Sequence, residues 1–152
     1  MEAAPDAGMA CFDSKYTYLL WRPITAIRNA DLDGNPDTSP DATWAPLVTT
    51  PNHPEYPSQH GCITSALAHV LANALGTTDI DATMPGATNG GTSATTTQTF
   101  ATVSDLLTQL VNARVWIGFH FRNSVLAGEN LGTAVANWEL RRYFLPTHDQ
   151  EG

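Results

Sequence analysis

Four stretches of this sequence carry apolar residues at spacings of three and four, the period of one face of an α-helix. No segment alternates between apolar and polar residues long enough to indicate a sheet. The sequence therefore predicts an all-α fold, a helical bundle of about four main helices. The predicted helices run from Ala7 to about Ala30, from a cap at Ser58 to about Leu75, from Ala94 to Ile117, and from a cap at Asn123 or Ser124 to a point before Pro146.

Two long segments between these helices are predicted to be loops. Turn-forming residues and then closely spaced prolines fill the segment from Asp31 to Pro57, and proline is incompatible with a helix interior. The segment from Thr77 to Thr92 is rich in glycine and threonine. Long loops in a compact domain are often functional, so both are expected to be active-site loops that control substrate access.

The length of 152 residues predicts a single helical domain over residues 1–152. No membrane-spanning helix is expected, because polar residues interrupt every apolar stretch well short of the roughly 20 residues that a span needs. Cys11 and Cys62 could form one disulfide or remain free thiols, and their spacing leaves both possibilities open. The sequence gives no indication of a cellular compartment.

The net charge of -8, from 7 Lys+Arg and 15 Asp+Glu, argues against nucleic acid or an anionic membrane as a partner. Any anion site must therefore be local, formed by a few grouped cations. Candidates for such a group are Lys15, Arg22, Arg28, Arg114 and Arg122.

The first candidate segment contains Lys15 and Arg22, seven residues apart on the first predicted helix. Seven residues are nearly two helical turns, so both side chains are expected on one face. An ammonium and a bidentate guanidinium could together hold one tetrahedral oxyanion. The alternative is a solvated basic stripe.

The second candidate segment is Tyr56–Gly61, where the proline-rich passage turns into a helix. A helix start exposes unpaired amides and the positive end of the helix dipole, which together favour an anion. Ser58 could contribute its hydroxyl, Gln59 its amide and His60 a proton. The alternative is a serine cap next to an exposed histidine.

The third candidate segment places Arg114 six residues before His120, across Gly118. Aromatic residues surround this histidine in the sequence, so its setting is half apolar. The alternative reading is a core histidine whose ring nitrogen bonds a backbone carbonyl.

Together the three segments resemble a known signature in order and spacing: a lysine, six residues and Arg-Pro; then Pro-Ser-x-His; then an arginine, five residues and a histidine. The chain from Lys15 to His120 is thus similar to the superfamily of vanadium-dependent haloperoxidases and phosphatidic-acid-phosphatase type acid phosphatases, and closest to the haloperoxidase-like branch. The resemblance implies that Lys15, Arg22 and Arg114 hold the equatorial oxygens of vanadate or phosphate, assisted by Ser58 and Gln59. It also implies that His120 is the vanadium ligand or the nucleophile toward phosphate, and that His60 is the acid or base.

Three activities remain open from this resemblance. The first is halide oxidation by hydrogen peroxide with vanadate as cofactor. The second is hydrolysis of a phosphomonoester through a phosphohistidine, since vanadate copies the geometry of phosphoryl transfer. The third is a catalytically inactive module that only binds the oxyanion.

The chain departs from the family pattern at two positions. Gln59 replaces the usual glycine between serine and histidine, and Ser124 replaces the aspartate that commonly fixes the tautomer of the second histidine. His120 would then be less basic, or another carboxylate, such as Glu129, or a backbone carbonyl would orient it.

The chain resembles only the catalytic C-terminal half of the haloperoxidases. It is therefore expected to be a fragment completed by an N-terminal bundle, or a compact form that self-associates as a homo-oligomer and so covers its apolar surface.

Overall fold

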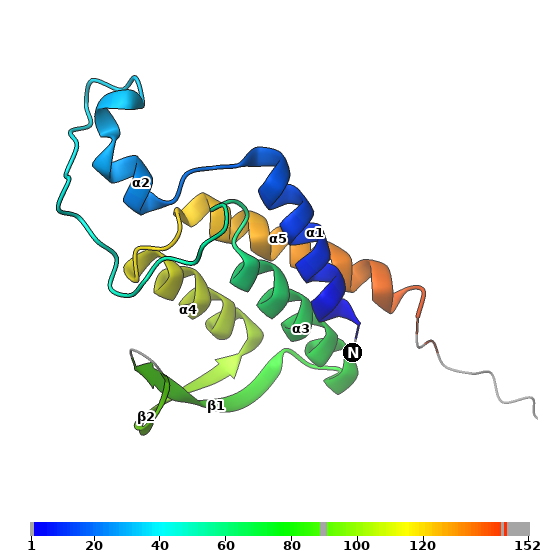
Figure 1. Ribbon diagram of the computed structural model, residues 1–152. Helices are drawn as coiled ribbons and strands as arrows, with labels where there is room; N and C mark the ends of the chain where they lie inside the picture. Colours follow the sequence, from blue (N-terminus) through cyan, green and yellow to red (C-terminus); the bar gives the residue numbers. More distant parts are fainter. Residues whose placement is uncertain (1, 89–90, 144, 146–152) are drawn as a thin grey trace, which may run out of the picture.

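The computed structural model describes residues 2–88, 91–143 and 145, and helices make up its main part (Figure 1). The predicted helical bundle is confirmed. Among the described residues, no helix combines the length and apolar character needed to cross a membrane. The elements in chain order are α1 (Ala3–Tyr18), α2 (Pro23–Arg28), the short 3₁₀ helix η1 (Ala30–Leu32), α3 (Gln59–Leu75), β1 (Asp79–Thr88), β2 (Gly91–Thr102), α4 (Val103–Trp116) and α5 (Arg122–Leu140).

The helices α3 and α5 lie side by side at the centre of the bundle (Figure 1). Glycines make this close approach possible: a Cβ atom at Gly132 of α5 would lie 2.0 Å from the Cys62 carbonyl oxygen of α3. A Cβ at Gly128 would lie 2.4 Å from the Ser58 carbonyl oxygen. The two helix starts are thereby neighbours, and the Ser58 N–H donates to the Ser124 carbonyl at 2.9 Å.

The helix α1 packs across α3 and α5 through small side chains (Figure 1). Cys11 and Cys62 are both buried in this core, and both are free thiols, which settles the question that the sequence left open. The core cluster consists of Ala3, Ala7, Cys11, Cys62, Ala66 and Ala136.

The predicted first helix, from Ala7 to Ala30, is two helices separated by an extended link. Leu19 ends α1 with a left-handed φ of 50°, and its N–H bonds the Lys15 carbonyl. Arg22 is extended because it precedes Pro23, which disfavours a helical conformation at the residue before it. The prediction that Lys15 and Arg22 share one helix face is therefore wrong.

The second correction concerns the segment from Thr77 to Phe100, predicted as a loop followed by helix. The structure instead has an antiparallel hairpin of β1 and β2, which projects from the bundle (Figure 1). Its frequent threonines are β-branched and suit strands, and the Thr83 and Thr99 hydroxyls pair across it at 2.9 Å. The helix α4 begins only at Val103, after a capping box formed by Thr102 and Asp105.

The predicted bounds of α3 are confirmed, whereas the predicted start of α5 is wrong. Ser58 caps α3, and Gly76 ends it with a left-handed φ of 68°, as the sequence predicts. In contrast, α5 begins at Arg122 with Phe121 as its N-cap residue, so the predicted caps at Asn123 or Ser124 are wrong.

Candidate oxyanion site

The proline-rich segment, residues 46–57, runs across one end of the helical bundle and is fixed there by backbone hydrogen bonds. The Leu47 N–H donates to the Ile117 carbonyl at 3.1 Å, and the Glu55 N–H donates to the Leu20 carbonyl at 3.0 Å. Gly118 turns the chain from α4 toward His120 with a φ of 84°, and a Cβ there would lie 2.9 Å from the Trp44 ring. These constraints bring all three candidate segments to one end of the bundle.

Lys15 is completely buried at this end. Its Nζ donates to the Pro54 carbonyl at 2.8 Å and to the Glu55 carbonyl at 3.0 Å. Loss of hydration lowers the pKa of Lys15 to about 8, and the charge of Arg22 acts in the same direction. The lysine therefore holds the proline-rich segment in place, and its third N–H has no acceptor among the residues that the structure describes.

Arg22 links the proline-rich segment to the region around His120. Its Nε donates to the His53 carbonyl at 3.0 Å, and its Nη1 donates to the Phe119 carbonyl at 3.0 Å. The same Nη1 lies 3.1 Å from His120 Nε2, and Nη2 lies 3.1 Å from His53 Nδ1. Four contacts from one guanidinium fix its position.

The tautomer of His120 follows from its two partners. Arginine can only donate, so Nε2 must accept from Arg22, and the ring proton must be on Nδ1. Nδ1 donates to Glu55 Oε1 at 2.7 Å. Burial lowers the pKa of His120 to about 4, outweighing the opposing effect of Glu55. The ring is therefore neutral at pH 7, with its lone pair on Nε2.

Glu55 is the residue of this site that the sequence reasoning missed. It is fully buried, and its carboxylate accepts from His120, from the Phe121 N–H at 3.0 Å and from the Ser124 hydroxyl at 2.6 Å. A carboxylate does orient His120, which was one of the predicted alternatives, but it is Glu55 and neither Glu129 nor a backbone carbonyl. The only signal in the sequence is that Glu55 is the one acidic residue among the closely spaced prolines.

Arg114 and His60 are held much less tightly. The Arg114 guanidinium lies 4.9 Å from the centre of the Phe119 ring, and among the described residues its buried Nε has no hydrogen-bond partner. Loss of hydration, followed by the charge of Arg22, lowers the pKa of Arg114 to about 10. The His60 side chain is exposed, yet reduced hydration and then the charge of Arg114 lower its pKa to about 4. His60 thus lies within the field of the cations.

The remaining predicted residues lie at the start of α3. Ser58 is buried, and its hydroxyl oxygen accepts from the Gly61 N–H at 3.4 Å, as expected for a cap. Gln59 is the first residue of α3 and is half-buried. The structure shows no side-chain hydrogen bond from Gln59 to the other site residues within its described part.

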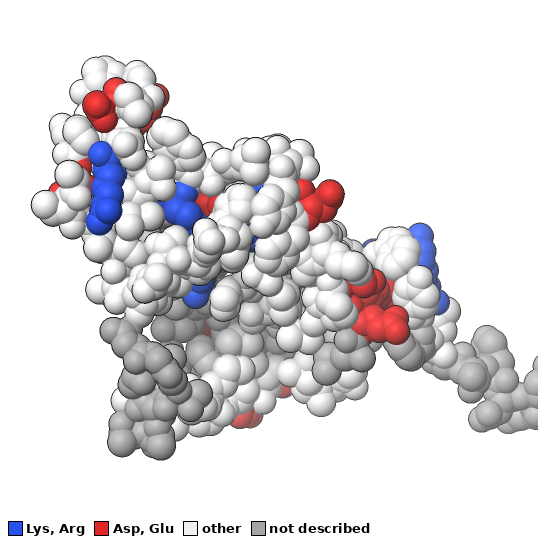
Figure 2. All heavy atoms as spheres, viewed as in Figure 1, with Lys and Arg blue, Asp and Glu red and all other residues white. Residues whose placement is uncertain are grey.

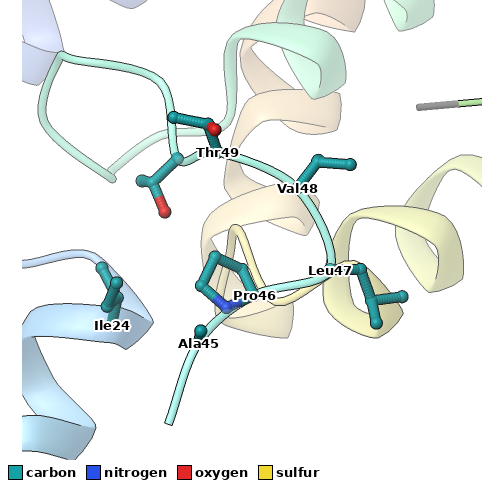
Figure 3. Close-up of a pocket in the computed structure, with 7 residues that line it drawn as sticks. Ile24, Ala45, Pro46, Leu47, Val48 and Thr49 are labelled. Carbon is teal, nitrogen blue, oxygen red and sulfur yellow. The ribbon is translucent and has the colours of Figure 1, made fainter. Parts of the chain in front are cut away.

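Two adjoining pockets lead toward Arg22. One of about 600 Å³ is lined by Tyr16, Arg22, Thr50 and His53, among others. The second, of about 870 Å³, lies between Ile24 of α2 and the 45–50 segment (Figure 3). The two pockets share Ile24 and Thr50, and Arg22 is the site cation that lines one of them.

Acidic and basic side chains are both spread over the visible surface. On the face shown in Figure 2, acidic atoms lie over the loop after α2 and over the far end of the bundle, and basic atoms lie beside α2, between α2 and α4, and again at the far end of the bundle. The described residues contain no group of three or more His, Cys, Asp or Glu side chains that could hold a bare metal ion. The donors present are cations and hydroxyls, which suit an oxyanion.

Comparison with known proteins places the chain in a family. Residues 1–145 match the family described as the VCPO second helical-bundle domain, and the chain belongs to this family. A comparison with curated proteins returned no match.

Solved structures of vanadium-dependent peroxidases share the fold. A holo-type bacterial vanadium-dependent chloroperoxidase is 23% identical with a TM-score of 0.72, over 89% of this chain and 32% of its own. A bacterial vanadium-dependent iodoperoxidase is 25% identical with a TM-score of 0.72, over 91% of this chain and 31% of its own. An apo-type bacterial chloroperoxidase is 23% identical with a TM-score of 0.70, over 92% and 35%. The chain thus spans about a third of the length of these proteins.

Proposed function

We propose that this chain binds vanadate and belongs to a haloperoxidase-like enzyme that oxidises halide with hydrogen peroxide. The observation that carries the proposal is the buried Nε of Arg114, which has no hydrogen-bond partner among the described residues and lies in the field of the Arg22 cation. The Glu55 carboxylate acts electrostatically on Lys15 and Arg22, and its two oxygens are already engaged by His120, the Phe121 N–H and Ser124. A buried cation without a counterion is costly, so this arrangement favours an anion.

The residues present fit vanadate. Among the described residues, one N–H of Lys15 and the Nε of Arg114 have no acceptor, and the Ser58 hydroxyl lies at the start of α3, where the helix dipole favours negative charge. These groups and Arg22 would hold the oxygens of the anion. His120 Nε2 carries the lone pair that would bind vanadium, and Arg22 Nη1 would exchange its contact with Nε2 for an anion oxygen. Bound vanadate supplies the Lewis acidity that activates hydrogen peroxide toward halide.

The chain's own contribution to the reaction is positioning and proton transfer. The fixed donors would stabilise negative charge that develops on the bound oxygens. His60 is neutral at pH 7, because its pKa is low, and can accept a proton from an incoming peroxide. The pocket beside Arg22 and His53 is the route by which peroxide and halide would enter.

A second candidate function is hydrolysis of a phosphomonoester. The neutral His120, with its proton on Nδ1, has the protonation state of a nucleophile toward phosphate. The third alternative is an inactive oxyanion-binding module.

One set of measurements on the same sample separates these functions. Orthovanadate binding, oxidation of bromide and iodide with peroxide, and hydrolysis of a generic phosphomonoester are measured on the wild type, His120→Ala and His60→Ala. For the proposed function, halide oxidation requires vanadate, disappears in His120→Ala and falls about a hundred- to ten-thousandfold in His60→Ala. Binding without either activity would favour the inactive module, and absence of binding would refute the proposal.

Self-association, or completion by another bundle, remains a proposal. Met9 of α1 and Trp138 of α5 are exposed and line an apolar pocket with Ala134 and Val135. Large exposed apolar side chains often mark an interface. Sedimentation velocity over a wide concentration range tests this, and a strict monomer would count against self-association.

A further inference from the structure

We infer that Glu55 is the positioning residue of His120. In this inference Ser124 holds the Glu55 carboxylate in place, and it does not take over the role of the aspartate that is common at its position in the family. The inference rests on the proposed function only for its effect on vanadate. The arrangement of Glu55, His120 and Ser124 belongs to the anion-free chain and is tested there.

The Glu55 carboxylate is fixed by three donors from the stretch that begins α5. Oε1 accepts from His120 Nδ1 at 2.7 Å and from the Phe121 N–H at 3.0 Å, and Oε2 accepts from Ser124 Oγ at 2.6 Å. All of these groups are close to fully buried, except that Phe121 is partly exposed. A charged acceptor with three donors in a dry site is held strongly, because each such bond is stronger than a neutral one.

The backbone of the same residue connects His120 to the cations. The Glu55 carbonyl accepts from Lys15 Nζ at 3.0 Å, and its N–H donates to the Leu20 carbonyl at 3.0 Å, two residues before Arg22. A shift of Glu55 would therefore move the lysine and the histidine together. Glu55 couples the direction of the Nε2 lone pair to the cations that would surround the anion.

The family pattern suggests that an aspartate at position 124 would support His120, but the geometry of this chain indicates the opposite. An aspartate there would place a second carboxylate against Glu55 Oε2, where the serine hydroxyl now donates at 2.6 Å. Two buried carboxylates at that distance repel each other unless one takes up a proton. Ser124→Asp should therefore damage the site of this chain, although it restores the common residue.

The first test reads the tautomer of His120 in the anion-free protein by ¹⁵N NMR of the imidazole nitrogens at pH 7.5. The signals are assigned by their absence in His120→Asn. The wild type should show a protonated Nδ1 and a bare Nε2, because Glu55 accepts from Nδ1. Ser124→Ala should keep this tautomer. In Glu55→Gln the amide can either accept from Nδ1 or donate to it, so only the donation from Arg22 to Nε2 still favours the Nδ1–H form, and a fraction of the Nε2–H form should appear.

The second test compares orthovanadate affinity and the tautomer across Glu55→Gln, Ser124→Asp and the double variant. Glu55→Gln should weaken vanadate about 10- to 100-fold, as is typical when the partner of a ligating histidine is removed. Ser124→Asp should also weaken it. In the double variant, the amide introduced by Glu55→Gln can accept from His120 Nδ1 and donate to the carboxylate introduced by Ser124→Asp. The double variant should therefore bind vanadate more tightly than Glu55→Gln alone and show more of the Nδ1–H tautomer.

Several outcomes would overturn the inference. A wild-type His120 with its proton on Nε2 would do so directly, without any variant or any vanadate. Loss of melting temperature in Glu55→Gln with an unchanged tautomer would mean that Glu55 is only structural. Independent effects of the two substitutions would show that position 124 does not act through Glu55. If the wild type fails to bind vanadate while its tautomer is as expected, the proposed function fails and the positioning role of Glu55 stands.

Discussion

The candidate site has two halves that differ in how they are held. The bonded half consists of Lys15, Arg22, Glu55 and His120, whose side chains make short contacts to backbone carbonyls and to one another. The open half consists of His60 and Arg114. His60 is exposed, and the buried Nε of Arg114 lacks a partner in the described part of the chain.

The bonded half is suited to positioning His120, and the open half is suited to binding a ligand. The bonded half fixes the lone pair of His120 before any ligand arrives, which is the preorganisation that catalysis by fixed charges requires. In the open half, the buried Arg114 Nε carries hydrogen-bonding capacity that no described residue uses. An oxyanion at His120 would satisfy the open half without dismantling most of the bonded half.

The largest expected effect comes from breaking the contact that supports both halves. Gly132→Ala places a Cβ 2.0 Å from the Cys62 carbonyl oxygen and 2.2 Å from Ser65 Oγ, so α3 and α5 must separate. We expect a loss of unfolding free energy of about 3 kcal/mol, at the upper end for overpacking, measured by urea denaturation.

Gly8→Ala is the matched control for this substitution. A Cβ at Gly8 of α1 would meet only the Ile63 Cδ1 atom, at an ordinary distance of 3.7 Å. Since alanine is a better helix former than glycine, this variant should gain about 0.5–1 kcal/mol. Equal losses in the two variants would contradict the close packing of α3 and α5.

Acid should weaken the bonded half through His120. Its pKa is about 4 in the folded chain and 6.5 as an ordinary value, so between these values the unfolded chain binds more protons. Stability from this group is complete above pH 6.5 and is lost as pH falls toward 4, by on the order of 3 kcal/mol. Urea denaturation of the wild type and His120→Gln between pH 7 and 4 measures it, and identical pH slopes would refute it.

Replacement of Lys15 and Arg114, one cation from each half, distinguishes the halves directly. In anion-free buffer, Lys15→Met removes the donor to the Pro54 and Glu55 carbonyls and should lower the unfolding free energy by about 1–3 kcal/mol. Arg114→Met should leave it nearly unchanged, because the Arg114 Nε has no partner among the described residues. Both variants should bind vanadate more weakly. A larger stability loss in Arg114→Met would remove the distinction between the halves.

The smallest expected effect is a dependence of anion affinity on the charge of Lys15. Its pKa is about 8 in the folded chain against an ordinary 10.5, so sulfate affinity should fall above pH 8, by at most about tenfold per pH unit. The sign for stability is opposite: between pH 8 and 10.5 the unfolded chain binds more protons, so this group makes the anion-free fold more stable as pH rises. Calorimetric titration with sulfate at pH 7, 8 and 9 checks the first effect, and a pH-independent affinity would contradict it.

The parts of the fold that the sequence predicted are those with local causes. Ser58 and Gly76 mark the ends of α3 because a cap and a left-handed stop act within a few residues. The break between Lys15 and Arg22 also has a local cause, because Pro23 disfavours a helical conformation at Arg22. The helical spacing of the apolar residues continues across this break, and it therefore predicted one continuous helix. The hairpin was missed because its threonines do not alternate with apolar residues and resemble a loop.

The site shows the same division. The spacing motifs indicated Lys15, Arg22, Arg114 and His120, and the structure brings these residues to one end of the bundle. Glu55 could not be found by spacing, since it reaches His120 from 65 positions away through the path of the proline-rich segment. Long-range pairing of this kind depends on tertiary structure, and one sequence gives no measure of it.

The most direct test of the account is a crystal structure of the chain with orthovanadate. The account predicts vanadate bonded to His120 Nε2, with Lys15 Nζ, an Arg22 nitrogen and Arg114 Nε each within about 3 Å of its oxygens. Glu55 should still accept from His120 Nδ1 in that structure. Vanadate bound elsewhere, or an Arg114 Nε that remains without an oxygen partner while His120 is occupied, would contradict the account.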